Sequence, residues 1–463
     1  MTLSSTPSPS DGPRAPAMAS VTDLAARLDR LPVVTGSHRL WAGLLGFFFL
    51  FDTFDLSAFG NTAPALRAEW GLTIGQVSLA TSAAFVGMFF GALIGGRASD
   101  RWGRRPVLLA GAATYSLFSL ATALAPDFET LVVLRLLTGI GMQATTGVLL
   151  VYVSEMFPRH LRGRYQAILL TIGIVGVPLA AFVARMVTPW GEGAWRWVYA
   201  VGAVGIVGTV VAVKLLPESA RWAAAHGRAD RAEALVTRLE DEAKAATGAP
   251  LPEPQPLPAP RTGSFGELLG RPYLKRTAVA SVAMVLLILS IYGFNSWVAT
   301  LLVERGFAQT TALTMVTILA IASVPGAFLP YFFVDRFERK NIILTLAVLS
   351  AAAVAVFGFV ANPVAMVVAG FVFSVFMQSI VAVLYTYLPE IYPTHLRGVG
   401  SGIANGLGRV AGVAGAFIVG GIFTAFGFTT VFVYLAVVVL LLGIVLAVFG
   451  ERTTARSLEQ ISG

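Results

Sequence analysis

The stretch Gly96-Arg97-Ala98-Ser99-Asp100-Arg101-Trp102-Gly103-Arg104-Arg105 lies between two apolar runs, near 76–96 and 106–125. Four arginines within ten residues are too costly to place in hydrocarbon, so the stretch is predicted to be a tight polar loop at a membrane surface. Short loops rich in Lys and Arg stay on the cytoplasmic side, so this loop also predicts the orientation of the two spans that flank it.

Composition places the whole chain in the membrane class. The 463 residues are 56% hydrophobic and 13% charged, with a mean hydropathy of +0.76. Soluble domains are about 45–50% apolar and about 25% charged. The net charge of +8 does not indicate nucleic-acid binding, because the cations cluster in loops on one side and suit an anionic leaflet. The absence of cysteine excludes disulfides and thiolate metal sites, and we expect neither a metal nor a cofactor.

Twelve apolar runs are long enough to cross a bilayer, which takes about 20 residues each. They fall near 40–63, 76–96, 106–125, 130–154, 164–186, 196–216, 276–302, 311–334, 341–361, 364–388, 398–423 and 428–449. The sequence therefore predicts an all-α membrane protein whose twelve transmembrane helices form two six-helix bundles. The predicted parts are a tail at 1–38 with a short amphipathic membrane-surface helix within 21–38, bundles at 39–216 and 276–450, a proline-rich linker at 217–275 with a short helix over 228–244, and a tail at 451–463.

The distribution of cations predicts the topology. Of the 33 lysines and arginines, only Arg67, Arg185, Arg196 and Arg305 fall in the expected outer loops. Arg135 and Arg409 fall within spans, and the remainder face the other side. Both tails and the central linker are therefore predicted to be cytoplasmic.

Two motifs recur at a common offset of 235 residues. The segment 100–105 (DRWGRR) is echoed at 335–340 (DRFERK), and 155–163 (EMFPRHLRG) is echoed at 390–398 (EIYPTHLRG). Two independent echoes at one offset indicate homologous halves in parallel, the architecture of transporters that rock two bundles about a central site.

The pattern G-x-x-x-D-R-x-G-R-R between two spans resembles the loop between spans 2 and 3 of the major facilitator superfamily. That resemblance implies a cytoplasmic gate held by charge pairs, in which Glu155 pairs either with Arg162 across the turn or with the 96–105 loop. A plain topological signal is the alternative reading. The implied gate residues are Gly96, Asp100, Arg101, Gly103, Arg104, Arg105, Glu155, Arg162, Asp335, Arg336, Glu390 and Arg397. Glu338 replaces the glycine in the second loop, which predicts a weaker gate there.

Asp52 and Asp55 lie in the middle of the first span, where each carboxylate costs about 2.5–3.5 kcal/mol unless it meets a cavity or a partner. Their i, i+3 spacing places both on one helix face. Two neighbouring carboxylates resist double ionisation, so one could hold a proton at neutral pH. They are the predicted proton-coupling residues, with a structural ion pair as the alternative.

Arg135 in span 4 lies at a depth close to that of Asp55, and either pairs with it or holds a substrate carboxylate. Arg409 is the second cation within a span, and snorkelling to the interface is its alternative. Other polar and aromatic residues within spans are candidate cavity-lining residues, although each alone could be a helix–helix contact. The predicted substrate-binding residues are Arg135, Gln143, Tyr292, Asn295, Trp297, Gln378, Asn405 and Arg409.

The segments Asp52-x-x-Asp55-Leu56 and Ala63-Pro64-Ala65-Leu66 resemble bacterial aromatic acid–proton symporters and niacin-transporter-like proteins. Thr53 replaces a glycine of the aromatic-acid pattern, and the glutamine-rich signatures of sugar porters are missing. The resemblance implies proton-coupled import of a small aromatic or heteroaromatic carboxylate by a monomer in the inner membrane, with protons and lipid as its other partners. The alternatives are a transporter of a neutral or cationic solute, such as a sugar, polyol or drug, and a non-transporting sensor. No motif indicates an enzyme.

Overall fold

The structure is a computed structural model that describes residues 21–255, 265–334, 336–393 and 395–453. The rest of the expected tails, at 1–20 and 454–463, the linker segment 256–264 and the predicted gate residue Asp335 lie outside the described residues. The described chain is built from α-helices and two short 3-10 helices joined by turns and loops.

The first half contains six segments of membrane-spanning length. Two of them are divided near glycine residues, so that each consists of consecutive short helices along one path. The helices are α2 (Gly36–Trp70), α3 (Ile74–Trp102), α4 (Arg104–Ala123), α5 (Phe128–Met156), α6 (Arg159–Ile174) with α7 (Gly176–Val187) and η1 (Thr188–Trp190), and α8 (Trp195–Gly202) with α9 (Gly205–Leu215).

The second half repeats this plan. Its helices are α13 (Arg271–Asn295) with α14 (Val298–Glu304), α15 (Gln309–Ile321) with α16 (Ser323–Phe328) and η2 (Leu329–Phe332), α17 (Arg339–Phe359), α18 (Pro363–Glu390), α19 (Arg397–Phe426) and α20 (Phe428–Phe449). By length and hydropathy the described chain has 11 candidate spans, the last of which covers 53 residues. Gly427, with a φ of +79°, divides that stretch into α19 and α20, so the predicted twelve-helix fold is confirmed.

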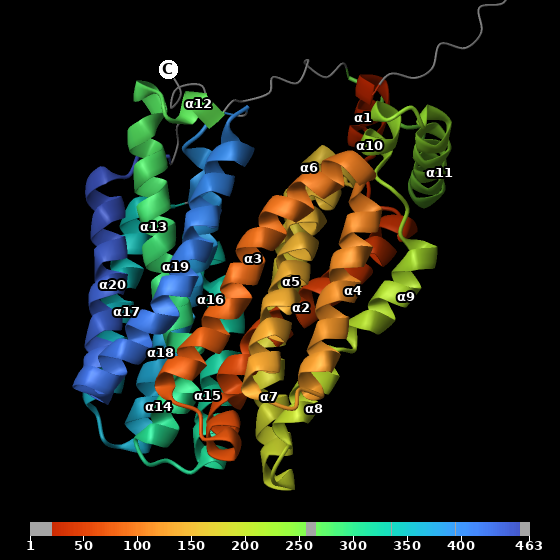
Figure 1. Cartoon of the computed structure of the whole chain (residues 1–463). Coiled ribbons are helices and arrows are strands. Elements are labelled where there is room, and N and C mark those ends of the chain that lie inside the picture. The colour runs from red at the N-terminus through yellow and green to blue at the C-terminus, as the bar shows by residue number, and fades with distance from the viewer. Residues whose placement is uncertain (1–20, 256–264, 335, 394, 454–463) are drawn as a thin grey trace, which may run out of the picture.

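Each half is a bundle of its own, and the two meet along α3 and α19, α7 and α15, and α2 and α14. Figure 1 shows the first half in red to yellow-green and the second in green to blue, with the helices of the two halves diverging toward the upper end of the view. The linker helices α10 (Ala220–Ala225), α11 (Ala229–Thr247) and α12 (Phe265–Leu268) lie at that upper end, here named the linker end.

Glycines allow very close contact between α3 and α5. A Cβ added at Gly87 would lie 2.0 Å from the carbonyl oxygen of Leu136, and one added at Gly139 would lie 2.2 Å from that of Ala84. Small residues bring helix backbones together where hydrocarbon provides no hydrophobic drive for association. These two helices therefore form a rigid frame for Arg135, which lies on α5.

The amphipathic helix α1 (Val21–Asp29) is shorter than predicted and packs on protein. Leu24 and Leu28 are fully buried in one cluster with Val236 and Leu239 of α11. The expectation of a membrane-surface helix is wrong, because the linker helices provide an apolar surface that covers the leucines. Arg27 and Arg30 of this segment both bind the carboxylate of Glu240, at 2.8 and 2.7 Å.

Candidate functional site

A closed ion pair lies inside the first half, between α2 and α5. The side chains of Asp55 and Arg135 are 0% and 1% exposed, and Arg135 Nη1 donates to Asp55 Oδ1 at 2.5 Å. Arg135 Nη2 also donates to the backbone carbonyl of Asp55 at 3.3 Å. The sequence left two roles open for Arg135, pairing with Asp55 or holding a substrate carboxylate. In this structure Arg135 pairs with Asp55.

The surroundings of this pair are aromatic and tightly packed. The guanidinium carbon of Arg135 lies 5.8 Å from the ring centroid of Tyr199 and 6.0 Å from that of Phe59. A Cβ added at Gly202 would lie 3.3 Å from Asp55 Oδ2, so this glycine leaves room for the carboxylate. That Oδ2 atom is buried and accepts no hydrogen bond in the described part of the chain, so it is a position where a proton could be held.

Asp52 lies one turn earlier on α2 and has a different environment. Its side chain is buried, and within the described residues Oδ1 has no hydrogen-bond partner. The groups that act on its carboxylate are Thr146 of α5, Arg409 of α19 in the other half, and Asp55. Arg409 is half-buried, and its Nη1 lies 3.9 Å from the sulfur of Met88 on α3. Asp52 and Arg409 are opposite charges on the two sides of the interface between the halves that form no ion pair within the described residues, and they are called the open charge pair below.

Thr53 lies between the two aspartates, at the position where the aromatic-acid pattern has glycine. Its hydroxyl reaches the carbonyl oxygens of Leu50, at 3.0 Å, and of Gly173 on α6. This side chain therefore joins two helices of the first half. The departure from the pattern is accounted for by helix packing.

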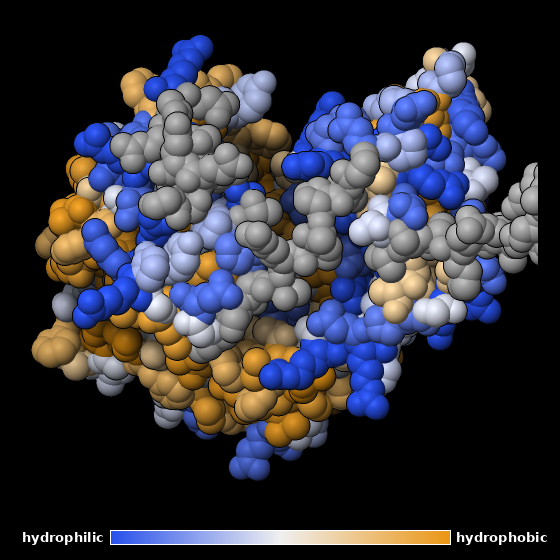
Figure 2. All heavy atoms as spheres, turned by 90° about the horizontal axis from the view of Figure 1, so that it is seen from above, coloured by the Kyte–Doolittle hydropathy of each residue, from blue (hydrophilic) through white to orange (hydrophobic). Residues whose placement is uncertain are grey.

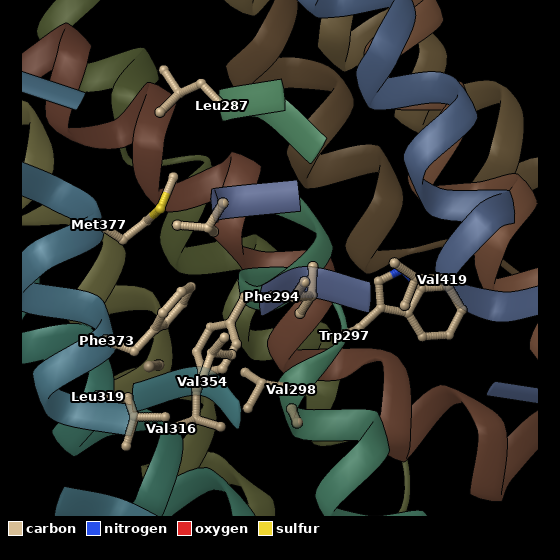
Figure 3. Packing of buried hydrophobic residues seen from close by; sticks show 14 of the residues in the cluster. Leu287, Phe294, Trp297, Val298, Val316, Leu319, Val354, Phe373, Met377 and Val419 are labelled. Atoms are coloured by element: carbon tan, nitrogen blue, oxygen red, sulfur yellow. The ribbon is translucent and has the colours of Figure 1, made fainter. Parts of the chain in front are cut away.

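The predicted aromatic residues lie in and beside the core of the second half. Trp297 is fully buried, with 0% of its surface exposed, and Figure 3 shows its indole beside Val419. Tyr292 packs edge-on against Phe85 of the first half, with ring centroids 4.9 Å apart. Both residues border a small cavity between α3, α13 and α19, which also contains Thr81 and Gly412.

The predicted amides are distributed over three places. Asn295 and Gln378 border one small cavity, together with Ser323 and Met377. Asn405 accepts a hydrogen bond from the hydroxyl of Tyr385 at 3.0 Å. The Oε1 atom of Gln143 is buried and has no hydrogen-bond partner within the described chain. In this conformation the structure does not bring the predicted substrate-binding residues into one pocket.

The opening motif forms a compact network at the linker end. Gly103 separates α3 from α4 with a φ of +111°, and an added Cβ would lie 2.2 Å from Glu218 Oε2. Glu218 accepts from the backbone N–H groups of Arg104 and Arg105, at 2.9 and 3.1 Å, and so caps α4. Arg104 binds Glu155 at 2.8 Å. Glu155 therefore pairs with the loop and not across its own turn.

The contacts repeat at the same offset of 235 residues as the motifs. Arg104–Glu155 corresponds to Arg339–Glu390, whose side chains lie 3.0 Å apart. The guanidinium of Arg162 donates to the carbonyl of Phe157, and that of Arg397 donates to the carbonyl of Tyr392, with both Nε–O distances at 3.3 Å. The two halves thus share side-chain geometry as well as sequence.

The remaining gate residues are more exposed. Asp100 lies 3.1 Å from Arg104 with its side chain 77% exposed, and Arg101, Gly96 and Arg336 are also exposed. Two acidic residues were missed by the sequence reasoning. Asp29 of α1 binds Arg162 at 2.9 Å and Arg221 at 3.1 Å, and Glu218 caps α4. The sequence around both residues is rich in arginine, and an isolated acidic residue among arginines is a signal that could have identified Asp29 and Glu218 as their partners.

A family model and similar proteins of known name both place this chain among membrane transporters. Residues 40–463 match the model of the family described as sugar (and other) transporter. The niacin transporter NiaP of Acinetobacter baylyi (strain ATCC 33305 / BD413 / ADP1) is 30% identical over 95% of this chain and 99% of its own length. The 3-(3-hydroxy-phenyl)propionate transporter of Escherichia coli (strain K12) is 30% identical over 84% and 88%.

The fold itself matches a solved structure of the xylose transporter XylE from E. coli in an inward open conformation. The TM-score is 0.73, with 91% of this chain and 98% of that chain covered. Sequence identity is 18%, so this likeness concerns the fold alone.

Proposed function

The chain belongs to the sugar (and other) transporter family of the major facilitator superfamily and is a multi-pass membrane transporter. We propose that it imports a small aromatic or heteroaromatic carboxylate together with protons. Two similar transporters are named for substrates of this class, since niacin is a pyridine carboxylate and 3-(3-hydroxyphenyl)propionate is a phenyl-substituted acid.

The observation that carries the proposal is the open pair of Asp52 and Arg409 across the two halves. An ionised Asp52 offsets part of the positive potential of Arg409 and repels an anion that approaches it. A proton on Asp52 removes that repulsion and leaves the half-buried Arg409 as an uncompensated cation. Arg409 then favours a substrate carboxylate, which its planar guanidinium can bind through two N–H groups. Proton binding and anion binding are therefore mutually favourable.

The second buried pair provides another proton site. Asp55 neutralises Arg135 inside the first half, where both side chains are buried. Protonation of Asp55 would weaken this contact and leave Arg135 charged, which favours either a rearrangement of α2 against α5 or a second interaction with substrate. Asp52 is the simpler coupling residue in this scheme, because its partner lies in the opposite half.

Alternating access would come from rocking the halves about this interface, with the linker end and both tails in the cytoplasm and the protein in the inner membrane. At the end opposite the linker, Arg67 of α2 binds Glu304 of α14 and so joins the two halves. At the linker end, the described pairs Arg104–Glu155 and Arg339–Glu390 each lie within one half. Closing the linker end would require such groups to exchange partners, so that charge pairs broken in one conformation are replaced by others in the next.

Uptake into proteoliposomes tests the substrate class. Purified protein is reconstituted, a pH gradient acid outside is imposed, and accumulation of labelled nicotinate, benzoate, xylose and an organic cation is measured. We expect gradient-dependent accumulation of one of the acids, abolished by a protonophore. Gradient-independent acid uptake would refute symport, and selective uptake of xylose or the cation would refute the carboxylate assignment.

A further inference from the structure

A pocket of about 510 Å³ lies at the linker end, away from the interface between the halves. It is formed where α4 begins and α9 ends, under the linker helices α10 and α11, and these elements lie together at the upper right of Figure 1. Five cationic side chains line it, namely Arg105, Lys214, Arg228, Arg231 and Arg238. The view of this end in Figure 2 shows mostly hydrophilic residues on the side that holds α1, α10 and α11.

The positive charge of this pocket is not cancelled by its lining. Glu218 is the acidic residue among the lining residues described, and its carboxylate already accepts from the backbone N–H groups of Arg104, Arg105 and Ser219 at 2.9, 3.1 and 2.7 Å. Within the described chain, Lys214 and Arg231 are exposed and form no ion pair. Arg238 pairs with Glu242 at 3.1 Å, whereas the other four lining cations form no ion pair within the described chain. An anion in the pocket would therefore meet Arg105, Lys214, Arg228 and Arg231 without a competing carboxylate.

The cations are held in place by specific contacts. Arg105 Nε donates to the carbonyl of Leu216 at 2.7 Å, which fixes its guanidinium at the end of α9. Arg228 lies over the ring of Trp222, 5.4 Å from the centroid. Arg238 donates to the hydroxyl of Ser37 at 3.0 Å. Three of the five side chains thus have defined positions before any ligand binds, which lowers the entropy lost on binding.

Exposed aromatic and apolar residues lie at and beside the pocket. Trp102 lines it and is 63% exposed, and tryptophan is enriched at the level of lipid headgroups. Below the rim formed by Lys214, the outward residues of α9 are apolar and exposed, with Val210 at 62% and Val213 at 50%. A ligand with an anionic head and an apolar tail would place the head among the cations and the tail along α9.

We propose that this pocket binds the phosphate headgroup of an anionic phospholipid from the adjacent leaflet. Continuity between the cationic pocket and the apolar face of α9 favours a lipid over a free phosphate ion, which would gain nothing from that face. Since Arg231 and Arg238 belong to α11 whereas Arg105 and Lys214 belong to α4 and α9, the bound lipid would join the linker helix to the first half.

Lipid titration of the full-length protein in neutral detergent tests this proposal. Binding of phosphatidylglycerol and phosphatidylcholine with the same acyl chains is measured by native mass spectrometry, and inorganic phosphate is titrated separately. A cation near a membrane surface is worth about 1 kcal/mol in attraction to anionic lipid, a factor of roughly five in affinity. The double variant Lys214→Gln/Arg231→Gln is therefore expected to lose about 25-fold in affinity for phosphatidylglycerol.

The matched control is Arg271→Gln/Lys275→Gln, which removes two exposed cations at the linker end of α13, in the other half. It should keep the wild-type affinity, and thermal melting of both double variants confirms that they fold. Equal binding of the two lipids by the wild type, or equal losses in the two double variants, would overturn the proposal. Saturable binding of inorganic phosphate as tight as that of phosphatidylglycerol would also overturn it, because the apolar face would then contribute nothing.

Discussion

Removing one charge from the Asp55–Arg135 pair is predicted to destabilise the protein more than removing both. The two side chains are 0% and 1% exposed and lie 2.5 Å apart, so both charges are buried and each is the other's counter-charge. In Asp55→Asn the guanidinium stays buried without an anion, and loss of one partner from a buried pair typically costs about 3–5 kcal/mol. For a bundle of this size that corresponds to a fall in melting temperature of very roughly 10 °C.

The double variant Asp55→Asn/Arg135→Gln removes the uncompensated charge as well. Replacement of an entire buried pair by neutral groups is often close to neutral in stability, so this variant is expected to recover at least about 2 kcal/mol relative to Asp55→Asn. The coupling energy is obtained from a double-mutant cycle of unfolding in detergent. Asp52→Asn is the control, because Asp52 accepts no hydrogen bond from Arg409, and it should change stability by no more than about 1 kcal/mol.

Additive losses in this cycle would refute the reasoning. If Asp55→Asn and Arg135→Gln each destabilised the protein and the double variant lost the sum, the two charges would not compensate each other. An Asp55→Asn variant as stable as the control would contradict the burial of Arg135 as a charged group.

Three further results are expected. Gly87→Ala should lower the free energy of unfolding by about 1–3 kcal/mol, because its Cβ would lie 2.0 Å from a backbone carbonyl of α5. Gly147→Ala is the control, because the space around its Cβ is open, and it should leave stability unchanged in the same melting assay. Equal effects of the two substitutions would contradict the packing argument. Partial burial raises the pKa of Glu242, but hydrogen bonds from Ser37 and its neighbours outweigh this and lower the pKa to about 2. The contact of α11 with α2 is therefore stabilising above about pH 4.5 and is lost as the pH falls toward 2. Hydrogen exchange in α11 should rise over that pH window in the wild type, and the same rise in Glu242→Gln would contradict this. Glu155→Gln should lower the melting temperature more than Glu390→Gln, because Glu155 binds Ser219 at 2.5 Å in addition to Arg104, and the reverse order would argue against a stronger first gate.

Hydropathy and charge counting predicted the twelve helices well, because a spanning helix must satisfy its own backbone hydrogen bonds and keep cations out of hydrocarbon. The echo at 235 residues predicted corresponding motifs, and the structure adds corresponding contacts such as Arg104–Glu155 and Arg339–Glu390. Sequence could place Arg135 and Asp55 at similar depth, but it could not give the rotation of α5 that turns one toward the other.

Partners that are distant in sequence were harder to predict. Asp29 and Glu218 lie in segments that look like tail and linker, and their arginine partners become neighbours only after the helices pack. The membrane-surface interpretation of α1 was wrong for a related reason, since an amphipathic pattern gives the apolar face but not the surface that covers it. The substrate-binding roles of Trp297, Gln378 and the other candidates stay predictions.

Substrate-driven proton movement tests the central claim most directly. Proteoliposomes that enclose a pH-sensitive dye receive the carboxylate identified by uptake, without an imposed gradient, and internal acidification is recorded for the wild type and for Asp52→Asn. We predict acidification by the wild type and none by Asp52→Asn, although the variant still exchanges labelled for unlabelled substrate. Acidification by Asp52→Asn at the wild-type rate would contradict the assignment of proton coupling to the Asp52–Arg409 pair.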